Sequence, residues 1–196
     1  IFRALIIALF IITLAVVCTL YFRPLFYFDI GYLKLEASSG KTASEIRHAY
    51  NSLIDYMCVL NRAPLQIPGF AMSEHGRIHF EDCKRIFDLF QIVCASCGIL
   101  TIISMIVHRK DPHTGYLKLA GILTIAIPAA IGILAAVNWN MLFTTFHKVV
   151  FRNDYWLFDP TQDPVILILP DTFFLQCVVM IAAIILAGGL LCLLIA

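Results

Sequence analysis

The chain has 196 residues, of which 61% are hydrophobic and 14% are charged, and its mean hydropathy is +0.89. Because about a quarter of the residues of a soluble domain are charged, this composition excludes an ordinary soluble protein. The formal net charge of +1 gives no basis for a nucleic-acid partner.

Four long uncharged stretches predict four transmembrane helices. Each stretch has about 19 or more residues, enough to cross a hydrocarbon core of ~30 Å as a helix. Because the backbone inside lipid must satisfy its own hydrogen bonds, helices are the expected form and the fold class is an all-α integral membrane protein. The predicted transmembrane helices are residues 1–23, 89–108, 119–138 and 172–196.

The first apolar stretch is expected to stay in the protein as a transmembrane helix. It is too long for the core of a typical signal peptide, and the sequence YFRPLFYFD that follows it has no small-residue cleavage site. The chain begins at Ile1 and ends inside an apolar run, so we expect both natural ends to be trimmed or disordered.

The charges of the connecting segments predict the orientation. Segment 109–118 carries three Lys or Arg side chains and one Asp, whereas segment 139–171 carries two basic and four acidic side chains. The positive-inside rule therefore puts segment 109–118 in the cytoplasm, together with both termini. Segments 24–88 and 139–171 are then expected to be extracytoplasmic.

Segment 24–88 is predicted to contain two helices. Thr42 followed by Glu45 in KTASEIRHAY forms a capping box, and apolar residues then recur at helical spacing, which predicts an amphipathic helix over about 43–60. The sequence APLQIPGF ends it, because Pro and Gly favour turns. A second helix is expected over about 73–88 and to continue without interruption into the second transmembrane helix.

Seven cysteines are present, but they do not form a disulfide framework. Five of them lie in predicted transmembrane helices, where a free cysteine behaves as a small apolar residue. Cys94 and Cys97 form a C-x-x-C inside an apolar helix with no second pair, so we expect neither a zinc site nor a redox site there. Cys58 and Cys83 both lie in the first extracytoplasmic segment, where a disulfide between them is one alternative.

The sequence MSEHGRIHFEDCKR, at the start of the second of these helices, is a candidate functional site. His75, His79 and Asp82 lie at positions i, i+4 and i+7, on one stripe of a helix. One interpretation is a solvated helix end. A second is a metal site, although the zinc-protease pattern needs Glu directly after the first His and Gly76 stands there. The third makes one imidazole a general acid or base, held in its tautomer by Asp82 or Glu74.

Segment 143–174, FTTFHKVVFRNDYWLFDPTQDPVILILPDTFF, is rich in Phe and Trp and holds a second histidine, His147. The composition favours a surface that meets lipid while it holds a few fixed polar groups. His147 is either an anchor at the membrane interface or a catalytic group. For Asp159 and Asp163, each followed by Pro, turn formation is the favoured interpretation.

Two blocks of the sequence resemble a known family, the bacterial lipoprotein intramolecular transacylases. They are RIHFEDCKRIFDLF before the second transmembrane helix and FHKVVFRNDYWLFDPTQDPVILILPDTFF before the last. The second block is the more specific, because its F-D-P-x-x-D-P and L-P-D-x-F-F spacings rarely recur by chance. The resemblance covers the four-span layout, both extracytoplasmic segments and nearly the whole chain, and His79 fits it better than His75.

The resemblance implies a particular reaction in the bacterial cytoplasmic membrane, with the active site on its extracytoplasmic side. Such enzymes take a lipoprotein whose N-terminal cysteine carries a diacylglyceryl group. They move its sn-2 acyl chain to the α-amino group of that cysteine, which leaves the N-acyl, S-monoacylglyceryl lyso-form. The expected partners are this lipoprotein N-terminus and membrane phospholipid, and no cofactor, metal or outside acyl donor is implied.

This reaction requires a base for the attacking amine, an acid for the departing glycerol oxygen and stabilisation of an oxyanion. We expect His79 to be the base and His147 the acid, with two alternatives left open: exchanged roles, or prior acylation of His79. Arg152 or Asn153 is expected to stabilise the oxyanion. The residues expected to line a substrate groove are Phe80, Trp156, Phe158 and Asp159.

Two other classes of function remain open at this stage. A metal-dependent hydrolase at the membrane surface would use His75, His79 and one further ligand. A non-enzymatic membrane scaffold would use the Phe-rich segment as a protein interface.

Overall fold

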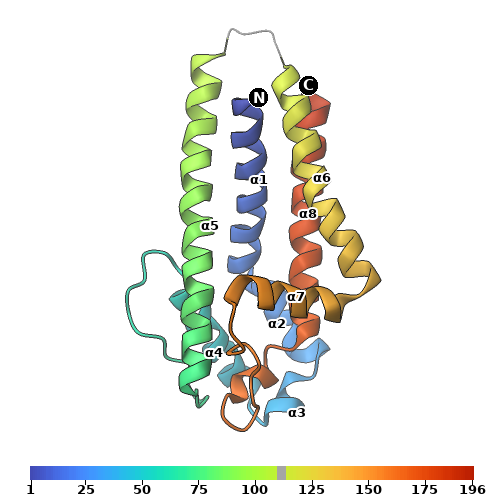
Figure 1. Ribbon diagram of the computed structural model, residues 1–196. Coiled ribbons are helices and arrows are strands. Elements are labelled where there is room, and N and C mark those ends of the chain that lie inside the picture. The colour runs from blue at the N-terminus through green and yellow to red at the C-terminus, as the bar shows by residue number, and fades with distance from the viewer. Residues whose placement is uncertain (110–113) are drawn as a thin grey trace. The chain divides into compact units, whose positions relative to one another are not determined.

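The computed structural model describes residues 1–109 and 114–196, apart from the side chains of residues 127, 131, 134 and 135. The described residues form helices and no strands, which confirms the predicted all-α class. The elements are α1 (Phe2–Tyr21), α2 (Arg23–Tyr32), α3 (Leu35–Ser39), α4 (Ala43–Tyr56), α5 (Glu74–Val107), α6 (Gly115–Val137), α7 (Trp139–Phe151), the 3₁₀ helix η1 (Pro164–Leu167) and α8 (Asp171–Ile195) (Figure 1).

Among the described residues, three helices, α1, α5 and α8, are long and apolar enough to cross a membrane. The remaining predicted span, 119–138, lies in α6, whose apolar section Gly115–Ala130 is shorter. The predicted cytoplasmic segment 109–118 falls partly on residues 110–113, which lie outside the described residues.

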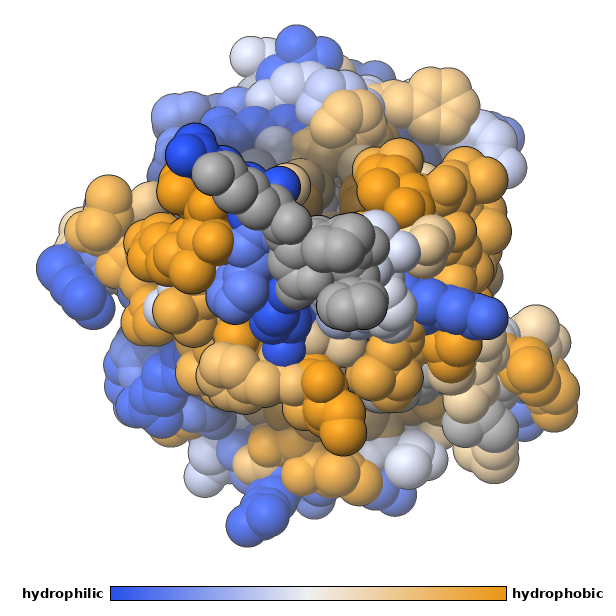
Figure 2. Space-filling view, turned by 90° about the horizontal axis from the view of Figure 1, so that it is seen from above, coloured by the Kyte–Doolittle hydropathy of each residue, from blue (hydrophilic) through white to orange (hydrophobic). Residues whose placement is uncertain are grey.

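The chain divides into two compact units, and the first contains residues 1–19, 89–139 and 177–196. Small residues let its helices approach closely, since a Cβ atom built on Gly121 would lie 2.8 Å from the carbonyl oxygen of Gly189. Many large apolar side chains of α1, α5 and α8 are exposed, as a surface in contact with lipid requires. Seen from above, hydrophobic residues make up much of the visible surface (Figure 2).

The second unit contains residues 20–88 and 140–176, and its core is built around aromatic rings. Phe26 of α2 is fully buried, stacks on Tyr50 of α4 at 3.7 Å between ring centroids, and meets the ring of Phe173 edge-on at 5.3 Å. Ser38 of α3 donates a hydrogen bond to the carbonyl oxygen of Leu167 at 3.1 Å, which ties α3 to η1.

Helix α4 begins as predicted and ends earlier than predicted. The capping box is present, with the Thr42 side chain accepting from the Glu45 backbone N–H and the Glu45 carboxylate accepting from the Thr42 N–H. The helix ends at Tyr56 instead of near residue 60. There the Asn61 amide donates to the Asp55 carbonyl oxygen at 2.9 Å, so a side chain satisfies a carbonyl group at the end of the helix.

Helix α5 runs without interruption from a charged first half, residues 74–88, into the apolar stretch that follows, as predicted. Its first turn is held by Asp163, whose carboxylate accepts hydrogen bonds from the Ser73 N–H and O–H, both at 2.7 Å. The Ser73 hydroxyl oxygen in turn accepts from the Gly76 N–H at 3.0 Å, which makes Ser73 the N-cap. Gly76 is required here, because a Cβ atom at that position would overlap the Asp163 carboxylate.

Replacing Asp163 should loosen this end of α5. Asp163 is only 4% exposed and accepts from two donors of the half-buried Ser73, so Asp163→Ala leaves both donors without this partner and should lower the free energy of unfolding by about 1–3 kcal/mol. Thermal unfolding of the detergent-solubilised protein measures the change. Asp159→Ala is the matched control, since Asp159 also precedes a proline but is exposed. Equal losses in the two variants would contradict this role of Asp163.

Candidate functional site

Two histidines from distant parts of the sequence lie next to each other in the second unit. His79 is on the charged first half of α5 and His147 is on α7, and their ring centroids are 6.0 Å apart. His79 is buried, with 7% of its surface exposed, and His147 is half-buried. We refer to these two residues as the histidine pair.

Aromatic side chains surround the histidine pair. Phe151 contacts both histidines, at 4.6 Å from His79 and 5.5 Å from His147 between ring centroids. The rings in contact with one or both histidines, here called the aromatic cluster, are Phe80, Phe143, Phe146, Phe151, Trp156 and Phe158. Because these rings displace water, they weaken the solvation of any charge that forms on the imidazoles.

The tautomer of His147 follows from its hydrogen bond. Its Nδ1 lies 2.7 Å from the carbonyl oxygen of Phe143, one helical turn earlier in α7. A carbonyl oxygen only accepts, so Nδ1 carries the proton, and Nε2 has a free lone pair whenever the ring is neutral. Burial lowers the pKa of His147 below its ordinary value, which favours this neutral form.

His79 is held more weakly and is harder to charge. Its Nε2 lies 3.5 Å from the Cys83 sulfur, and its buried Nδ1 has no hydrogen-bond partner among the described residues. Burial, and secondarily the charge that His147 can carry, lower the pKa of His79 to about 4, while Asp82 acts in the opposite direction. Because each imidazolium disfavours the other, the histidine pair holds at most one extra proton near neutral pH.

Cys83 is a neighbour of His79 that the sequence analysis did not assign to the site. Burial, followed by the nearby charge of Asp82, raises the pKa of Cys83 to about 12, so the group is a thiol at neutral pH. A thiol that donates to His79 Nε2 leaves the proton of the neutral ring on Nδ1. Cys83 and Cys58 are both free thiols in the described structure.

The two carboxylates expected to orient His79 bind other partners. Asp82 accepts from Arg85 at 2.8 Å and from the Asn153 amide at 3.4 Å. Glu74 is exposed and accepts from two nitrogens of Arg77, at 2.5 and 3.0 Å. Within the described residues neither carboxylate is hydrogen-bonded to His79, and Asp82 influences it through charge.

The expected oxyanion-stabilising residues lie in the connection after α7. Arg152 is exposed and has a φ of +57°, in the left-handed region. Asn153 is fixed at both ends of its amide, since Nδ2 donates to Asp82 and Oδ1 accepts from the Tyr155 N–H at 3.1 Å.

The expected groove residues are placed in two groups. Phe80 is buried against Phe158 at 5.5 Å, Phe158 meets the His79 ring edge-on at 5.4 Å, and Trp156 packs on His147 at 4.7 Å. Asp159, in contrast, is exposed and accepts from the Thr161 N–H and hydroxyl at 2.9 and 2.8 Å. This is the turn geometry favoured from its sequence.

His75, one of the ligands in the metal-site hypothesis, packs against an aromatic ring outside the aromatic cluster. His75 is exposed and stacks on the ring of Tyr155, with centroids 4.3 Å apart. In the described part of the chain, no group of three or more His, Cys, Asp or Glu side chains is arranged to hold a metal ion.

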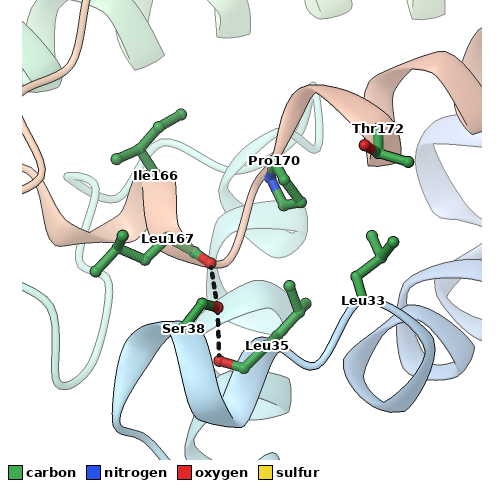
Figure 3. Close-up of a pocket in the computed structure, with 7 residues that line it drawn as sticks. All are labelled: Leu33, Leu35, Ser38, Ile166, Leu167, Pro170 and Thr172. Atoms are coloured by element: carbon green, nitrogen blue, oxygen red, sulfur yellow. Dashed lines mark hydrogen bonds between the residues drawn. The ribbon is translucent and has the colours of Figure 1, made fainter.

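A separate apolar pocket of about 340 Å³ lies in the same unit (Figure 3). Two side-chain hydroxyls line the pocket, those of Ser38 and Thr172. The Ser38 hydroxyl is hydrogen-bonded to the carbonyl oxygens of Leu35 and Leu167. The lining residues are Leu33, Leu35, Ser38, Ile166, Leu167, Pro170 and Thr172. None of them belongs to the histidine pair or the aromatic cluster.

Comparison with known proteins finds one family. The family model described as lipoprotein intramolecular transacylase Lit matches residues 1–174. A solved structure of the membrane-integral lipoprotein intramolecular transacylase Lit from Bacillus cereus is 36% identical, covers 98% of this chain and 90% of its own, and superposes with a TM-score of 0.95. No curated protein matches the chain.

Two further solved structures of the Bacillus cereus protein carry a substitution at one histidine. The histidine is replaced by arginine in one and by alanine in the other. Both are 36% identical to this chain and cover 98% of it, with TM-scores of 0.87 and 0.88 and 86% and 88% of their own chains covered.

The histidine pair should titrate at unusually low pH. In the unfolded chain a histidine titrates near ~6.5, so between that value and the folded pKa of His79, about 4, the folded protein binds fewer protons. Stability should therefore be full above that window and be lost as the pH falls through it. Nitrogen-15 NMR of the imidazoles measures the titration, and unfolding measurements across the same range measure the stability.

One substitution separates the two causes of the lowered pKa of His79. His147→Gln removes the neighbouring charge but keeps the protein around His79, so the His79 pKa should rise above about 4 and stay below its ordinary value, because burial is the larger cause. A His79 pKa at its ordinary value in the native protein would contradict the buried site.

The Cys83 thiol should resist modification in the folded protein. Only the thiolate reacts rapidly with maleimides, and burial keeps the pKa of Cys83 at about 12. Mass spectrometry after labelling in detergent should find residue 83 unmodified until the protein is denatured. Cys58, the other free thiol of this unit outside the apolar helices, gives the internal comparison, and rapid labelling of Cys83 in the native protein would exclude the contact with His79.

Proposed function

This chain belongs to the lipoprotein intramolecular transacylase (Lit) family of acyltransferases, and from that premise we propose that it makes lyso-form lipoproteins. It moves the sn-2 acyl chain of the diacylglyceryl group to the α-amino group of the same N-terminal cysteine. The observation that carries the proposal is the histidine pair, two imidazoles 6.0 Å apart that burial keeps neutral.

The reaction is a rearrangement within one substrate molecule. The amine nitrogen attacks the carbonyl carbon of the sn-2 ester, a C–N bond forms, and the C–O bond to glycerol then breaks. Direct attack closes a flexible ring through the cysteine and glycerol atoms, so the protein has to hold that ring in its reactive conformation. Packed aromatic side chains suit this task, because they restrict a lipid substrate without competing for the reacting polar atoms.

One proton has to move from the amine to the glycerol oxygen. The tautomer of His147 supports its assignment as the base, because Nε2 carries the free lone pair of the neutral ring. His79, with its proton on Nδ1, is assigned to the glycerol oxygen, to which it donates a hydrogen bond as the C–O bond breaks. The proton that His147 accepts is the one the glycerol oxygen gains, so none is consumed overall.

This assignment exchanges the roles expected from the sequence. His79 was the expected base because two carboxylates are near it in the sequence, but the hydrogen bonds of Asp82 and Glu74 go to other groups. The substitution of one histidine in two solved structures of the Bacillus cereus relative supports a histidine-dependent reaction in the family. His79 therefore acts in two ways. Its Nδ1–H donates a hydrogen bond to the glycerol oxygen, and its position beside His147 prevents both rings from being protonated at once.

The proposed topology has four spans, with both termini in the cytoplasm and the histidine pair on the extracytoplasmic side of the bacterial membrane. It is supported by α1, α5 and α8, by the apolar section of α6, and by the basic character of segment 109–118. In this topology the charged first half of α5 presents His79 outside the membrane, close to the diacylglyceryl group of a lipoprotein.

Substitution of either member of the histidine pair should abolish the transfer. His79→Ala and His147→Ala should each lower the rate by roughly 100-fold or more, because the first removes the donor to the leaving oxygen and the second removes the base. Fragmentation mass spectrometry of a lipoprotein N-terminal peptide locates the acyl group, whose movement does not change the total mass. His48→Ala is the control, since His48 is exposed on α4 and its loss should leave the rate unchanged. Transfer that survives both substitutions would discard the assigned site.

A further inference from the structure

The indole N–H of Trp156 is a buried donor without an acceptor. Its Nε1 is inaccessible to solvent and makes no hydrogen bond with any of the residues that the structure describes. An indole nitrogen can only donate, so no other interaction replaces the missing acceptor. Because unpaired buried donors destabilise a folded protein, such a group in a native structure requires an explanation.

The position of Trp156 beside His147 supplies an explanation for this unpaired donor. Its ring packs on His147 with centroids 4.7 Å apart and an interplanar angle of 33°, and Phe143 meets it nearly edge-on at 6.4 Å. The ring of His79 lies 6.0 Å from that of His147, and its Nδ1 is the other buried ring nitrogen of the site without a hydrogen-bond partner in the described chain. Together with His147 Nε2, the aromatic cluster thus presents two N–H donors and one lone pair that no described residue uses.

These three groups match the three sites of charge in the reaction. The amine has a proton to lose, the glycerol oxygen gains negative charge as it leaves, and the carbonyl oxygen becomes an oxyanion in the tetrahedral intermediate. His147 and His79 serve the first two in the proposed function. The third requires a donor that is fixed before the reaction begins, since preorganised donors are what stabilise an oxyanion in a site that excludes water.

We propose that Trp156 donates a hydrogen bond from Nε1 to the carbonyl oxygen of the sn-2 ester. This inference rests on the proposed function. As the amine nitrogen attacks, the π electrons of the C=O bond move to that oxygen, and the indole N–H stabilises the resulting negative charge. When the electrons return, the C–O bond to glycerol breaks, the leaving oxygen takes the proton and the indole keeps its own.

The donors expected from the sequence are less well placed for this role. Asn153 already uses its amide nitrogen on Asp82 and its amide oxygen on the Tyr155 N–H. Arg152 is exposed, and no contact in the described chain directs its guanidinium to the histidine pair. A neutral indole has a further advantage, because it adds no positive charge beside two imidazoles of which one has to accept a proton.

The test removes the N–H and keeps the ring. Trp156 is replaced by β-(3-benzothienyl)alanine through genetic code expansion, which exchanges N–H for sulfur within the same fused-ring shape, and Trp156→Phe is the simpler second variant. Trp139→Phe is the matched control, because the chain has only two tryptophans. Transfer is measured on a synthetic diacylglyceryl lipopeptide in detergent, and unfolding temperatures confirm that the variants are folded.

The isostere and Trp156→Phe should each lower kcat by roughly 100- to 1000-fold with little change in KM, as loss of one oxyanion donor does. Trp139→Phe should react like the native protein. An isostere that reacts as fast as the native protein would overturn the donor role, even if Trp156→Phe is slow, because the ring shape would then be what matters. If the native protein itself transfers no acyl group, the proposed function fails and the donor role fails with it.

Discussion

The proposed reaction depends on two imidazoles that pack together among aromatic rings, one of them buried and the other half-buried. Bringing His79 and His147 to 6.0 Å within aromatic side chains makes a charge on either one unfavourable, and two charges together more so. The histidine pair is therefore suited to hold one proton for a short time and pass it on. An acyl transfer within one substrate needs that capacity, because its proton begins on the amine and ends on the glycerol oxygen.

The fold serves this arrangement by fixing the two helices that carry the histidines. The Asp163 carboxylate clamps Ser73 at the start of α5, and Gly76 leaves room for that carboxylate. His79 follows within the next turn. On α7, the Phe143 carbonyl oxygen sets the tautomer of His147 from one turn away. The His147 ring is thus oriented by a backbone carbonyl group and the His79 ring contacts the Cys83 side chain, without a carboxylate bonded to either ring among the described residues.

Much of the fold was predictable because it depends on local patterns. The length of the apolar stretches predicts α1, α5 and α8, and the Thr42–Glu45 pair predicts the start of α4. The end of α4 was placed too late, because the side-chain contact of Asn61 with the Asp55 carbonyl oxygen has no clear sequence pattern. The continuity of α5 from its charged half into its apolar half was predictable from the absence of a helix-breaking residue.

The candidate site was predictable only in part. His79 and His147 were each candidates from their own segments, but only the family resemblance joined them in one site, since nothing in their spacing along the chain reveals that they meet. The contact of Cys83 with His79 had a usable signal, the i, i+4 spacing on a helix, but a buried thiol and a solvated one look alike in a sequence. The pairing of Asp163 with Ser73 joins segments 90 residues apart, and the proline after Asp163 indicated a simple turn instead.

The most direct test of the account is a crossover experiment with the purified protein. Two diacylglyceryl lipopeptides of different peptide mass are mixed, one with an isotope-labelled chain at sn-2 and the other unlabelled, and each has a distinguishable chain at sn-1. If the transfer is intramolecular, every N-acylated product carries the sn-2 chain of its own peptide, with label confined to the peptide that brought it. Labelled chains on the unlabelled peptide, or sn-1 chains on nitrogen, would contradict an intramolecular transfer at the histidine pair.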